Sequence, residues 1–499
     1  MDLLVQLMKT AIDPQVLINI CWGFLVGLFF GTVPGLTATL AIALLLPLTF
    51  GFPPHIALAV CGGIFMGGMY GGSITATLIN IPGAPANAIT AIEAYPLTKK
   101  GQAPRAMRVA AFCSSLGGIL GVILSVILLY PLSKLFLAFR SEDKAVLIIF
   151  ALVVSALLES RAIIKGIVAT LFGMMLATIG LDYFTFMPRI TFGVKPLIRG
   201  LDLLTVVVGA FCVAEVLTQL GQRLGAVDLK GVRATLRSHS WKEFVFNRDD
   251  LKEVGILNIL RSALFGWIVG VLPGGGGAMA SLINYSFARA FSKKKAEYGQ
   301  GSVEGVGAAE TGNNAMCGGA AVPMVLFGIP GDSVTAIILG VLLIHGLIPG
   351  PYLLIEQGHL VAALYAGLFV AAVLVYLTFL LAARQYVWLC SVRKSILYPF
   401  IMLAALIGLY GSTYSFDQLL ISGCLGLIIW YLRSGGYPTV PFLMGFILGP
   451  LLERFVRTTL SMKSYSAFVT SPISIALWIL TLLSIFIFGF WLPKLLKRS

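Results

Sequence analysis

IPGAPANAIT, residues 81–90, interrupts a long apolar region of this chain, and the similar IPGDSVTAII, residues 329–338, interrupts another. Proline removes a backbone donor and clashes with the preceding helical turn, while glycine accepts backbone conformations that other residues avoid. Each phrase therefore predicts a break in a helix. Unpaired backbone groups cost several kcal/mol in lipid, so such a break is tolerated only inside protein or beside water.

Both breaks lie in a sequence typical of a membrane protein. Of the 499 residues, 58% are hydrophobic and 11% are charged, whereas about a quarter are charged in an ordinary globular domain. No Asp, Glu, Lys or Arg occurs between Asp13 and Glu93, a stretch several times longer than the roughly 20 residues of one spanning helix. Charge-free runs elsewhere bring the expected number of transmembrane or re-entrant helical segments to about ten to fourteen. The predicted fold class is an all-α polytopic integral membrane protein.

The charges and cysteines fit the same class. The formal charge is +14, but Lys and Arg lie in the gaps between apolar runs, as expected for cytoplasmic loops, so no nucleic-acid partner is predicted. Seven cysteines occur singly in apolar segments, without a CxxC pair, which favours packing over disulfides or zinc. The four histidines lack metal-ligand spacing, and we expect no tightly bound cofactor.

The chain repeats itself around a polar centre. GTVPGLTATL, residues 31–40, resembles GVLPGGGGAMA, residues 270–280. MYGGSITATLINIPG, residues 69–83, resembles MCGGAAVPMVLFGIPG, residues 316–331. Two related halves with broken helices are typical of secondary transporters, whose sites lie where the broken segments meet. Because a basic cluster follows the first IPG but precedes the second, we expect an inverted repeat.

The repeat divides the chain into four predicted regions. Residues 1–220 form the first membrane repeat, and residues 253–383 form the core of the second. Residues 221–252 have more Lys and Arg than Asp and Glu, which predicts a cytoplasmic amphipathic connector. Residues 384–499 are apolar and aromatic without a motif, and we assign them to scaffold helices and subunit contacts.

Breaking these helices exposes groups that bind ions. A helix amino terminus offers a carboxylate free N–H groups and about half a positive charge, while unwound carbonyls and Ser, Thr or Asn oxygens suit sodium. The residues predicted to bind substrate are Pro34, Gly35, Thr37, Thr39, Ser73, Asn80, Pro82, Gly83, Gly274, Gly275, Gly276, Asn314, Pro330, Gly331 and Ser333. Those predicted to bind the coupling ion are Thr75, Asn80, Asn87, Thr90, Asn313, Asn314, Asp332 and Thr335. Close helix packing is the alternative role for the Gly, Ser and Thr residues.

Two carboxylates beside the motifs allow two interpretations. Glu93 and Glu310 each fit either a proton-coupling group or a helix cap. Coupling to protons instead of sodium would make them central to transport.

Other activities find less support in the sequence. PGGGGAMA, residues 273–280, lacks the Gly-Lys-Ser/Thr ending of a phosphate-binding loop. A membrane-embedded enzyme would need a dense catalytic cluster, which the sequence does not contain. Two unlike broken repeats also fit one occluded site better than the symmetric pore of a channel.

Four long phrases carry a family resemblance. They are GTVPGLTATLAIALLLPLTF (31–50), YGGSITATLINIPGAPANAITAIEAYPLTKKGQAPRA (70–106), VLPGGGGAMASLINYSFARAFSKK (271–294) and GAAETGNNAMCGGAAVPMVLFGIPGDSVTAIILG (307–340). They closely resemble the large membrane subunit of tripartite tricarboxylate transporters, the TctA family, and the likeness covers nearly the whole chain.

The resemblance implies a secondary transporter of the bacterial inner membrane. Its implied partners are the lipid bilayer, a small four-helix membrane subunit and a periplasmic solute-binding protein. Its implied substrates are citrate and other carboxylates, taken up with an ion gradient that is usually of sodium, with protons as the alternative. A self-sufficient carboxylate carrier, which needs no binding protein, is the other possibility within transport.

Overall fold

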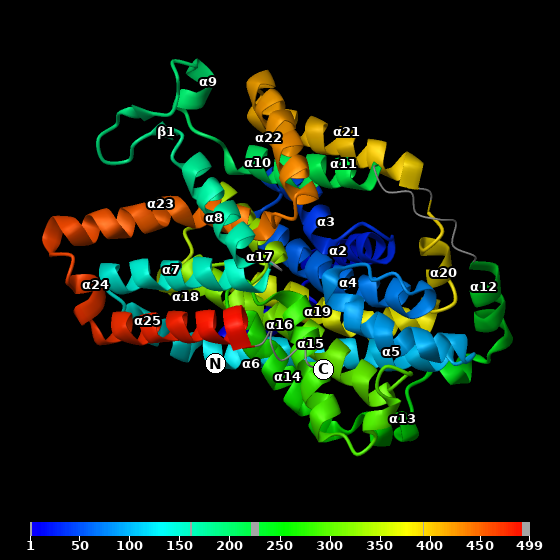
Figure 1. The fold of residues 1–499 in the computed structure, drawn as a ribbon. Coiled ribbons are helices and arrows are strands. Elements are labelled where there is room, and N and C mark those ends of the chain that lie inside the picture. The colour runs from blue at the N-terminus through cyan, green and yellow to red at the C-terminus, as the bar shows by residue number, and fades with distance from the viewer. Residues whose placement is uncertain (1, 160–161, 221–228, 393, 492–499) are drawn as a thin grey trace.

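The computed structural model describes the whole chain except residues 1, 160–161, 221–228, 393 and 492–499 (Figure 1). The described residues are almost entirely helical, with one two-stranded antiparallel sheet. Eight of their helices are long and apolar enough to cross a membrane, one bent helix pair gives a ninth candidate, and five shorter apolar helices accompany them. The chain is therefore an all-α polytopic membrane protein, as the sequence predicts.

The helices follow one another along the chain, and η denotes short 3₁₀ or π segments. Those up to residue 220 are α1 (Asp2–Ile12), α2 (Pro14–Thr32), α3 (Ala38–Leu45), η1 (Leu46–Gly51), α4 (Pro54–Ile79), η2 (Pro85–Asn87), α5 (Ala88–Lys99), α6 (Ala103–Leu137), α7 (Ser141–Leu158), α8 (Ile163–Ala177), α9 (Lys195–Ile198), α10 (Leu203–Val207), η3 (Val208–Val213) and α11 (Ala214–Leu220). The two strands are β1 (Gly180–Leu181) and β2 (Pro188–Arg189).

The second part of the chain continues the all-helical pattern. Its helices are α12 (Leu229–Ser238), η4 (Trp241–Phe244), α13 (Arg248–Val254), α14 (Ile256–Val271), α15 (Gly276–Phe291), η5 (Lys295–Glu297), α16 (Val303–Phe327), α17 (Ser333–Ile344), α18 (Pro351–Glu356), α19 (Gly358–Ala382), α20 (Tyr386–Leu389), α21 (Lys394–Thr413), α22 (Phe416–Ser434), α23 (Thr439–Met462), α24 (Ala467–Thr470), α25 (Pro472–Ser484) and η6 (Ile485–Trp491).

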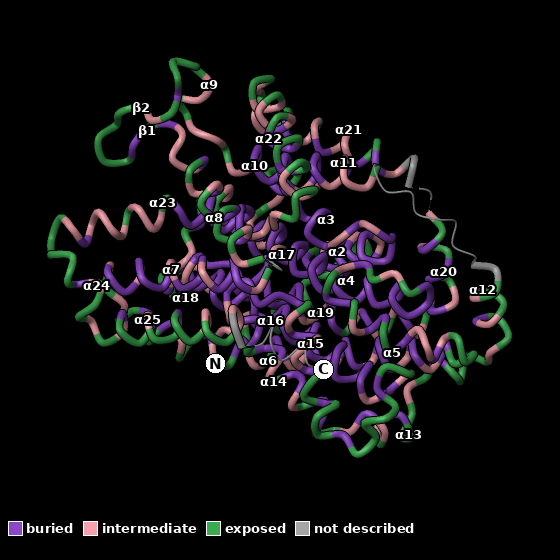
Figure 2. Tube along the Cα trace, in the orientation of Figure 1, coloured by how far each residue is buried: buried purple, intermediate pink, exposed green. Residues whose placement is uncertain are grey.

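Helices α4 and α16 form the centre of the molecule, where Figure 2 shows mostly buried chain. Residues 56–79 of α4 are all buried, and so are residues 305–326 of α16. Both helices are rich in Gly and Ala and carry no polar stripe. A helix without a polar face is stable only when it is covered on all sides, and small residues let its neighbours approach closely.

The breaks occur where the sequence predicts them, and they are built alike in both halves. Helix α4 ends at Asn80 with φ 57°, and α16 ends at Gly328 with φ 66°. The IPG glycines then pack against equivalent carbonyls. A Cβ placed on Gly83 would lie 2.2 Å from the Gly31 carbonyl oxygen, and one on Gly331 would lie 2.5 Å from that of Gly270. Only glycine fits at either position, because no side-chain atom can approach that closely.

The connector predicted at residues 221–252 is described from residue 229 onward. It contains α12, η4 and α13, and it is tied to α6 by ion pairs. Arg108 Nε lies 2.6 Å from Asp250 Oδ2, and Arg105 Nε lies 3.2 Å from Asp250 Oδ1. Away from the core, the β1–β2 hairpin projects at the upper left of Figure 1.

Candidate functional site

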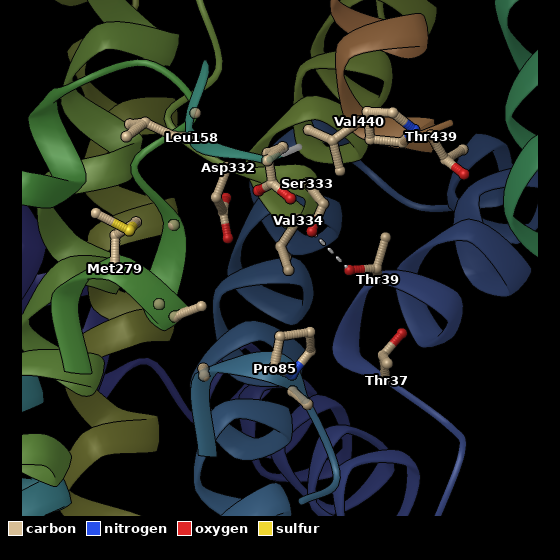
Figure 3. Close-up of a pocket in the computed structure, with 18 of the residues that line it drawn as sticks. Thr37, Thr39, Pro85, Leu158, Met279, Asp332, Ser333, Val334, Thr439 and Val440 are labelled. Atoms are coloured by element: carbon tan, nitrogen blue, oxygen red, sulfur yellow. Dashed lines mark hydrogen bonds between the residues drawn. The ribbon is translucent and has the colours of Figure 1, made fainter. Parts of the chain in front are cut away.

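A cavity of about 670 Å³ lies where the broken segments of the two halves meet (Figure 3). Helices α3, α15 and α17 all begin at this cavity, and the η2 turn that leads into α5 closes it from another side. The lining therefore includes residues 37–39 and 84–86 from the first half, with residues 274–279 and 332–334 from the second. Sequence segments about 240 residues apart thus form one site.

Polar side chains fix where two of these helices begin. The Thr37 hydroxyl accepts a hydrogen bond from the Leu40 amide at 3.2 Å, which caps α3. Asp332 Oδ1 accepts one from the Thr335 amide at 2.9 Å, and Thr335 Oγ1 accepts one from the Asp332 amide at the same distance. These reciprocal bonds form a capping box on α17. The remaining N–H groups of each first turn have no intrahelical partner.

The two halves touch at the cavity through a pair of hydroxyl groups. Thr39 Oγ1 and Ser333 Oγ lie 3.0 Å apart, and Figure 3 draws this contact. Thr39 belongs to the first turn of α3, and Ser333 is the first residue of α17. This wall of the cavity therefore combines helix amino termini and hydroxyl groups, which attract anions, with the carboxylate of Asp332.

Charged side chains form the other wall of the cavity. They are Lys165 in α8, Glu215 in α11 and Arg433 near the end of α22. Glu159, after α7, lies instead beside the start of α15, where a Cβ placed on Gly276 would lie 3.5 Å from its Oε1. Lys165 Nζ donates to the Gly435 carbonyl oxygen at 2.5 Å. Arg433 Nη1 lies 2.7 Å from Glu215 Oε2, so these two charges neutralise each other. Residues 436–440, at the start of α23, complete this wall.

A buried carboxylate lies deeper in the molecule. Glu310 of α16 is fully buried, and three hydroxyl groups donate to it. Ser73 Oγ lies 2.7 Å from both carboxylate oxygens, Ser114 Oγ lies 2.5 Å from Oε2, and Thr90 Oγ1 donates to Oε1. The Asn87 amide donates to Ser73 Oγ at 2.9 Å and to the Met69 carbonyl at 3.1 Å.

Glu93 has a different set of partners. Its carboxylate accepts hydrogen bonds from the backbone amides of Gly299, Gly301 and Ser302, at 2.6, 3.1 and 2.8 Å. The Tyr285 hydroxyl donates to it at 2.6 Å. Glu93 therefore holds the segment that precedes α16, whose amino-terminal cap is Ser302.

The structure brings together part of the predicted site. The predicted residues that line the cavity are Thr37, Thr39, Gly274, Gly275, Gly276, Asp332 and Ser333. Those that gather at or next to Glu310 are Ser73, Asn87 and Thr90. Those that form the backbone breaks without lining the cavity are Pro34, Gly35, Pro82, Gly83, Pro330 and Gly331.

Five predicted residues neither line the cavity nor hydrogen-bond to the Glu310 carboxylate or its hydroxyl donors. Asn80 is exposed at the end of α4, and Thr75 Oγ1 donates to the Gly72 carbonyl within its own helix. The Thr335 amide donates to Asp332 Oδ1 in the capping box of α17. Asn314 donates to the Glu310 carbonyl oxygen at 3.1 Å, and the Asn313 side chain lies beneath Gly277 of the cavity wall.

Sequence reasoning missed the charged wall. Lys165 separates two charge-free runs, residues 145–158 and 166–181, and both are shorter than the roughly 20 residues of one span. Such short neighbouring runs indicate helices too short to span on their own, but they do not place Lys165 at the cavity. Nothing in the sequence pairs Ser114 with Glu310, because single serines in an apolar helix have no distinctive pattern.

The fold and this site define a multi-pass membrane protein with a central polar cavity between two helix-break regions. The family model for the tripartite tricarboxylate transporter TctA family matches residues 17–444, and the chain belongs to this family. It is thus a tricarboxylate transporter subunit, and membership of a tripartite family implies partner subunits.

Two relatives from Agrobacterium vitis are similar to the chain. One is named "Uncharacterized 52.8 kDa protein in TAR-I ttuC' 3'region" and is 34% identical over 488 residues, which cover 96% of this chain and 94% of the relative. The other is named "Uncharacterized protein in TAR-II ttuC' 3'region" and is 36% identical over 217 residues, which cover 42% of this chain and 88% of the relative. No solved structure matches the chain.

Proposed function

We propose that this chain is the permease subunit of a binding-protein-dependent secondary transporter that imports tricarboxylates or related carboxylates with a cation. The observation that carries the proposal is the cavity between the starts of α3, α15 and α17 and the charged wall around Lys165. Free N–H groups and an ammonium group replace the water that a carboxylate loses on entry.

The shape of the cavity suits a small substrate with more than one carboxylate. Its volume of about 670 Å³ falls within the range of roughly 300–1,000 Å³ that is usual for small-molecule sites. Helix amino termini lie on one wall and Lys165 on the other. A di- or tricarboxylate bridges both walls, whereas a monocarboxylate reaches only one.

The charges of the cavity favour symport with a cation. Arg433 and Glu215 form an ion pair, which leaves Lys165, Glu159 and Asp332 as the other charged residues of the described lining. A substrate with several negative charges that entered alone would meet net repulsion, which a low dielectric strengthens. A cation that binds with the substrate offsets this repulsion, and we propose sodium because the oxygen donors of the site are of the hard type that sodium prefers.

The proposed partners follow from the family. We propose a small four-helix membrane subunit and a periplasmic solute-binding protein that delivers the carboxylate, with the complex in the bacterial inner membrane. The alternative is a self-sufficient carrier, which would load its substrate directly from solution.

Uptake by proteoliposomes tests the proposal. The chain and its small partner subunit are reconstituted, and labelled citrate is supplied with an inward sodium gradient, with or without the binding protein. We expect uptake only when sodium and the loaded binding protein are both present, and none when potassium replaces sodium. Equal uptake without the binding protein would establish the self-sufficient carrier, and failure to take up any di- or tricarboxylate would refute the proposed function.

A further inference from the structure

The carboxylate of Glu310 lacks a positive partner in the described part of the chain. Its contacts there are the hydroxyls of Ser73, Thr90 and Ser114, and the amide of Asn87 donates to Ser73 Oγ beside it. Its side chain is fully buried. A buried carboxylate is costly unless a positive charge compensates it, and charged residues inside membrane proteins are therefore rare and mostly functional. The local hydroxyls reduce this cost but supply no charge.

Amide groups without partners lie on the helical turn that follows Glu310 and on the η2 turn packed against α16. Asn87 Oδ1, Asn314 Oδ1 and both polar side-chain atoms of Asn313 lack a hydrogen-bond partner within the described residues, and all three side chains are fully buried. Leaving one such group unsatisfied costs about 1–3 kcal/mol. Several unsatisfied amide groups lie along one turn of α16 and the adjoining η2 turn, which indicates that this region binds a ligand. Because amide oxygens are among the free groups, that ligand is expected to be a cation.

We propose that the coupling sodium ion binds at Glu310, with oxygen ligands drawn from Asn87 and Asn313 and from the hydroxyls of Ser73 and Thr90. The inference rests on the proposed function, and it identifies the residues that hold the ion. Carboxylate, amide and hydroxyl oxygens are the ligands of hard cations. Each hydroxyl suits the site with and without the ion. It has one proton to donate to Glu310 when sodium is absent, and two lone pairs to offer the cation when sodium is bound.

The position of this site couples the ion to the substrate. Ala86 and Met69 line the cavity. Asn87 directly follows Ala86 and donates to the Met69 carbonyl oxygen at 3.1 Å. Asn313 lies beneath Gly277, where a Cβ would lie 2.5 Å from Asn313 Oδ1. An ion held by Asn87 and Asn313 therefore fixes the floor of the cavity, so sodium raises substrate affinity and substrate raises sodium affinity by the same factor.

Thermal unfolding of the purified chain in detergent tests the site without transport. Sodium chloride is titrated against potassium chloride at constant ionic strength. A ligand that binds only the folded state raises the melting temperature as its concentration passes its Kd. We expect a saturable, sodium-specific rise for the native chain, an affinity at least roughly tenfold weaker for Glu310→Gln, and weaker sodium binding for Asn313→Ala. The matched control is Glu304→Gln on the same helix, whose carboxylate accepts from Ser292, and it should respond like the native chain.

The outcomes separate this site from the proposed function. A native chain that sodium and potassium stabilise equally, or Glu310→Gln and Asn313→Ala variants with the native sodium response, would overturn the site. If Glu310→Gln does not fold, the Asn313→Ala variant decides whether sodium binds at this site, because it keeps the Glu310 carboxylate. A sodium response that depends on Glu310, in a chain that takes up no carboxylate, would leave the ion site standing and refute only the proposed function.

Discussion

Thr39 and Ser333 are 294 positions apart in the sequence, and their hydroxyl oxygens lie 3.0 Å apart at the cavity. Each belongs to the first turn of a helix that follows a Pro-Gly break, Thr39 in α3 and Ser333 in α17. The two halves of the chain therefore build one cavity between them instead of one each. A change in how the halves pack would open or close this contact together with the cavity.

Removing this pair of hydroxyls should weaken substrate binding. The double variant Thr39→Val with Ser333→Ala is expected to raise the KM of carboxylate uptake roughly tenfold, because one or two hydrogen bonds of about 1 kcal/mol each are lost. The control is Thr178→Val, whose hydroxyl donates to its own helix on the exposed surface. Uptake kinetics measured against substrate concentration give the answer, and an unchanged KM would remove this pair from the site.

Lys165 should contribute more than any hydroxyl. Lys165→Gln keeps a polar side chain, one atom shorter, but removes its charge, so we expect KM to rise roughly ten- to a hundredfold, in line with about 1.5–3 kcal/mol for a hydrogen bond to a charged group. Lys165→Arg should recover part of this loss. The control is Lys252→Gln, which affects only an exposed pair with Asp249. Native kinetics in Lys165→Gln would show that the charged wall does not touch substrate.

A substitution at Gly83 tests the close backbone packing at the first IPG break. A Cβ at this position would lie 2.2 Å from the Gly31 carbonyl oxygen and 2.6 Å from the Gly72 Cα. Gly83→Ala should lower the melting temperature, with a loss of about 1–3 kcal/mol or more in the free energy of unfolding. Gly51→Ala is the matched control, because no atom lies within 4 Å of its added Cβ. Equal melting temperatures for the two variants would argue against this packing.

Asn80 should matter for stability more than for transport. It is exposed and has φ 57°, a left-handed conformation in which Asn and Gly are favoured over Ala. Asn80→Ala is expected to cost about 1 kcal/mol of stability with native KM, and Asn80→Gly to retain stability. A large loss of uptake in an Asn80→Ala protein that is folded would instead place this residue in the substrate site, as its sequence context suggests.

Glu93 and Glu310 should respond differently to the same substitution. Glu93→Gln replaces a carboxylate oxygen by a donor where three backbone amides and the Tyr285 hydroxyl all donate. We expect a fall in melting temperature corresponding to about 1–3 kcal/mol or more, with the sodium-dependent rise retained. Loss of the sodium response in a stable Glu93→Gln protein would contradict its structural role.

The sequence predicts the breaks better than the surroundings of the site. Pro34, Pro82 and Pro330 carry a direct physical signal, because proline and glycine restrict the backbone locally whatever surrounds them. Lys165 and Arg433 carry no such signal: in a sequence each reads as a basic residue at the end of an apolar run. Their place at the cavity depends on how α8, α22 and α23 pack, and no local pattern encodes that packing.

The residues proposed to bind sodium show the same limit of prediction from local sequence patterns. Asn87 and Asn313 stand out in the sequence because amides are costly inside a membrane. The partners that complete the site, Ser114 of α6 and Glu310 of α16, meet only through helix packing across 196 positions. Sequence reasoning therefore singled out Glu310 as a proton-coupling group or a helix cap, but not which side chains surround it.

A density map of the chain with its partner subunit, determined by electron cryo-microscopy in sodium and citrate, tests the location of the site most directly. We predict density for the carboxylate between the first turns of α3, α15 and α17 and the Lys165 ammonium group. A citrate molecule resolved elsewhere in the chain, with this cavity free of it, would contradict the assignment of the cavity as the substrate site.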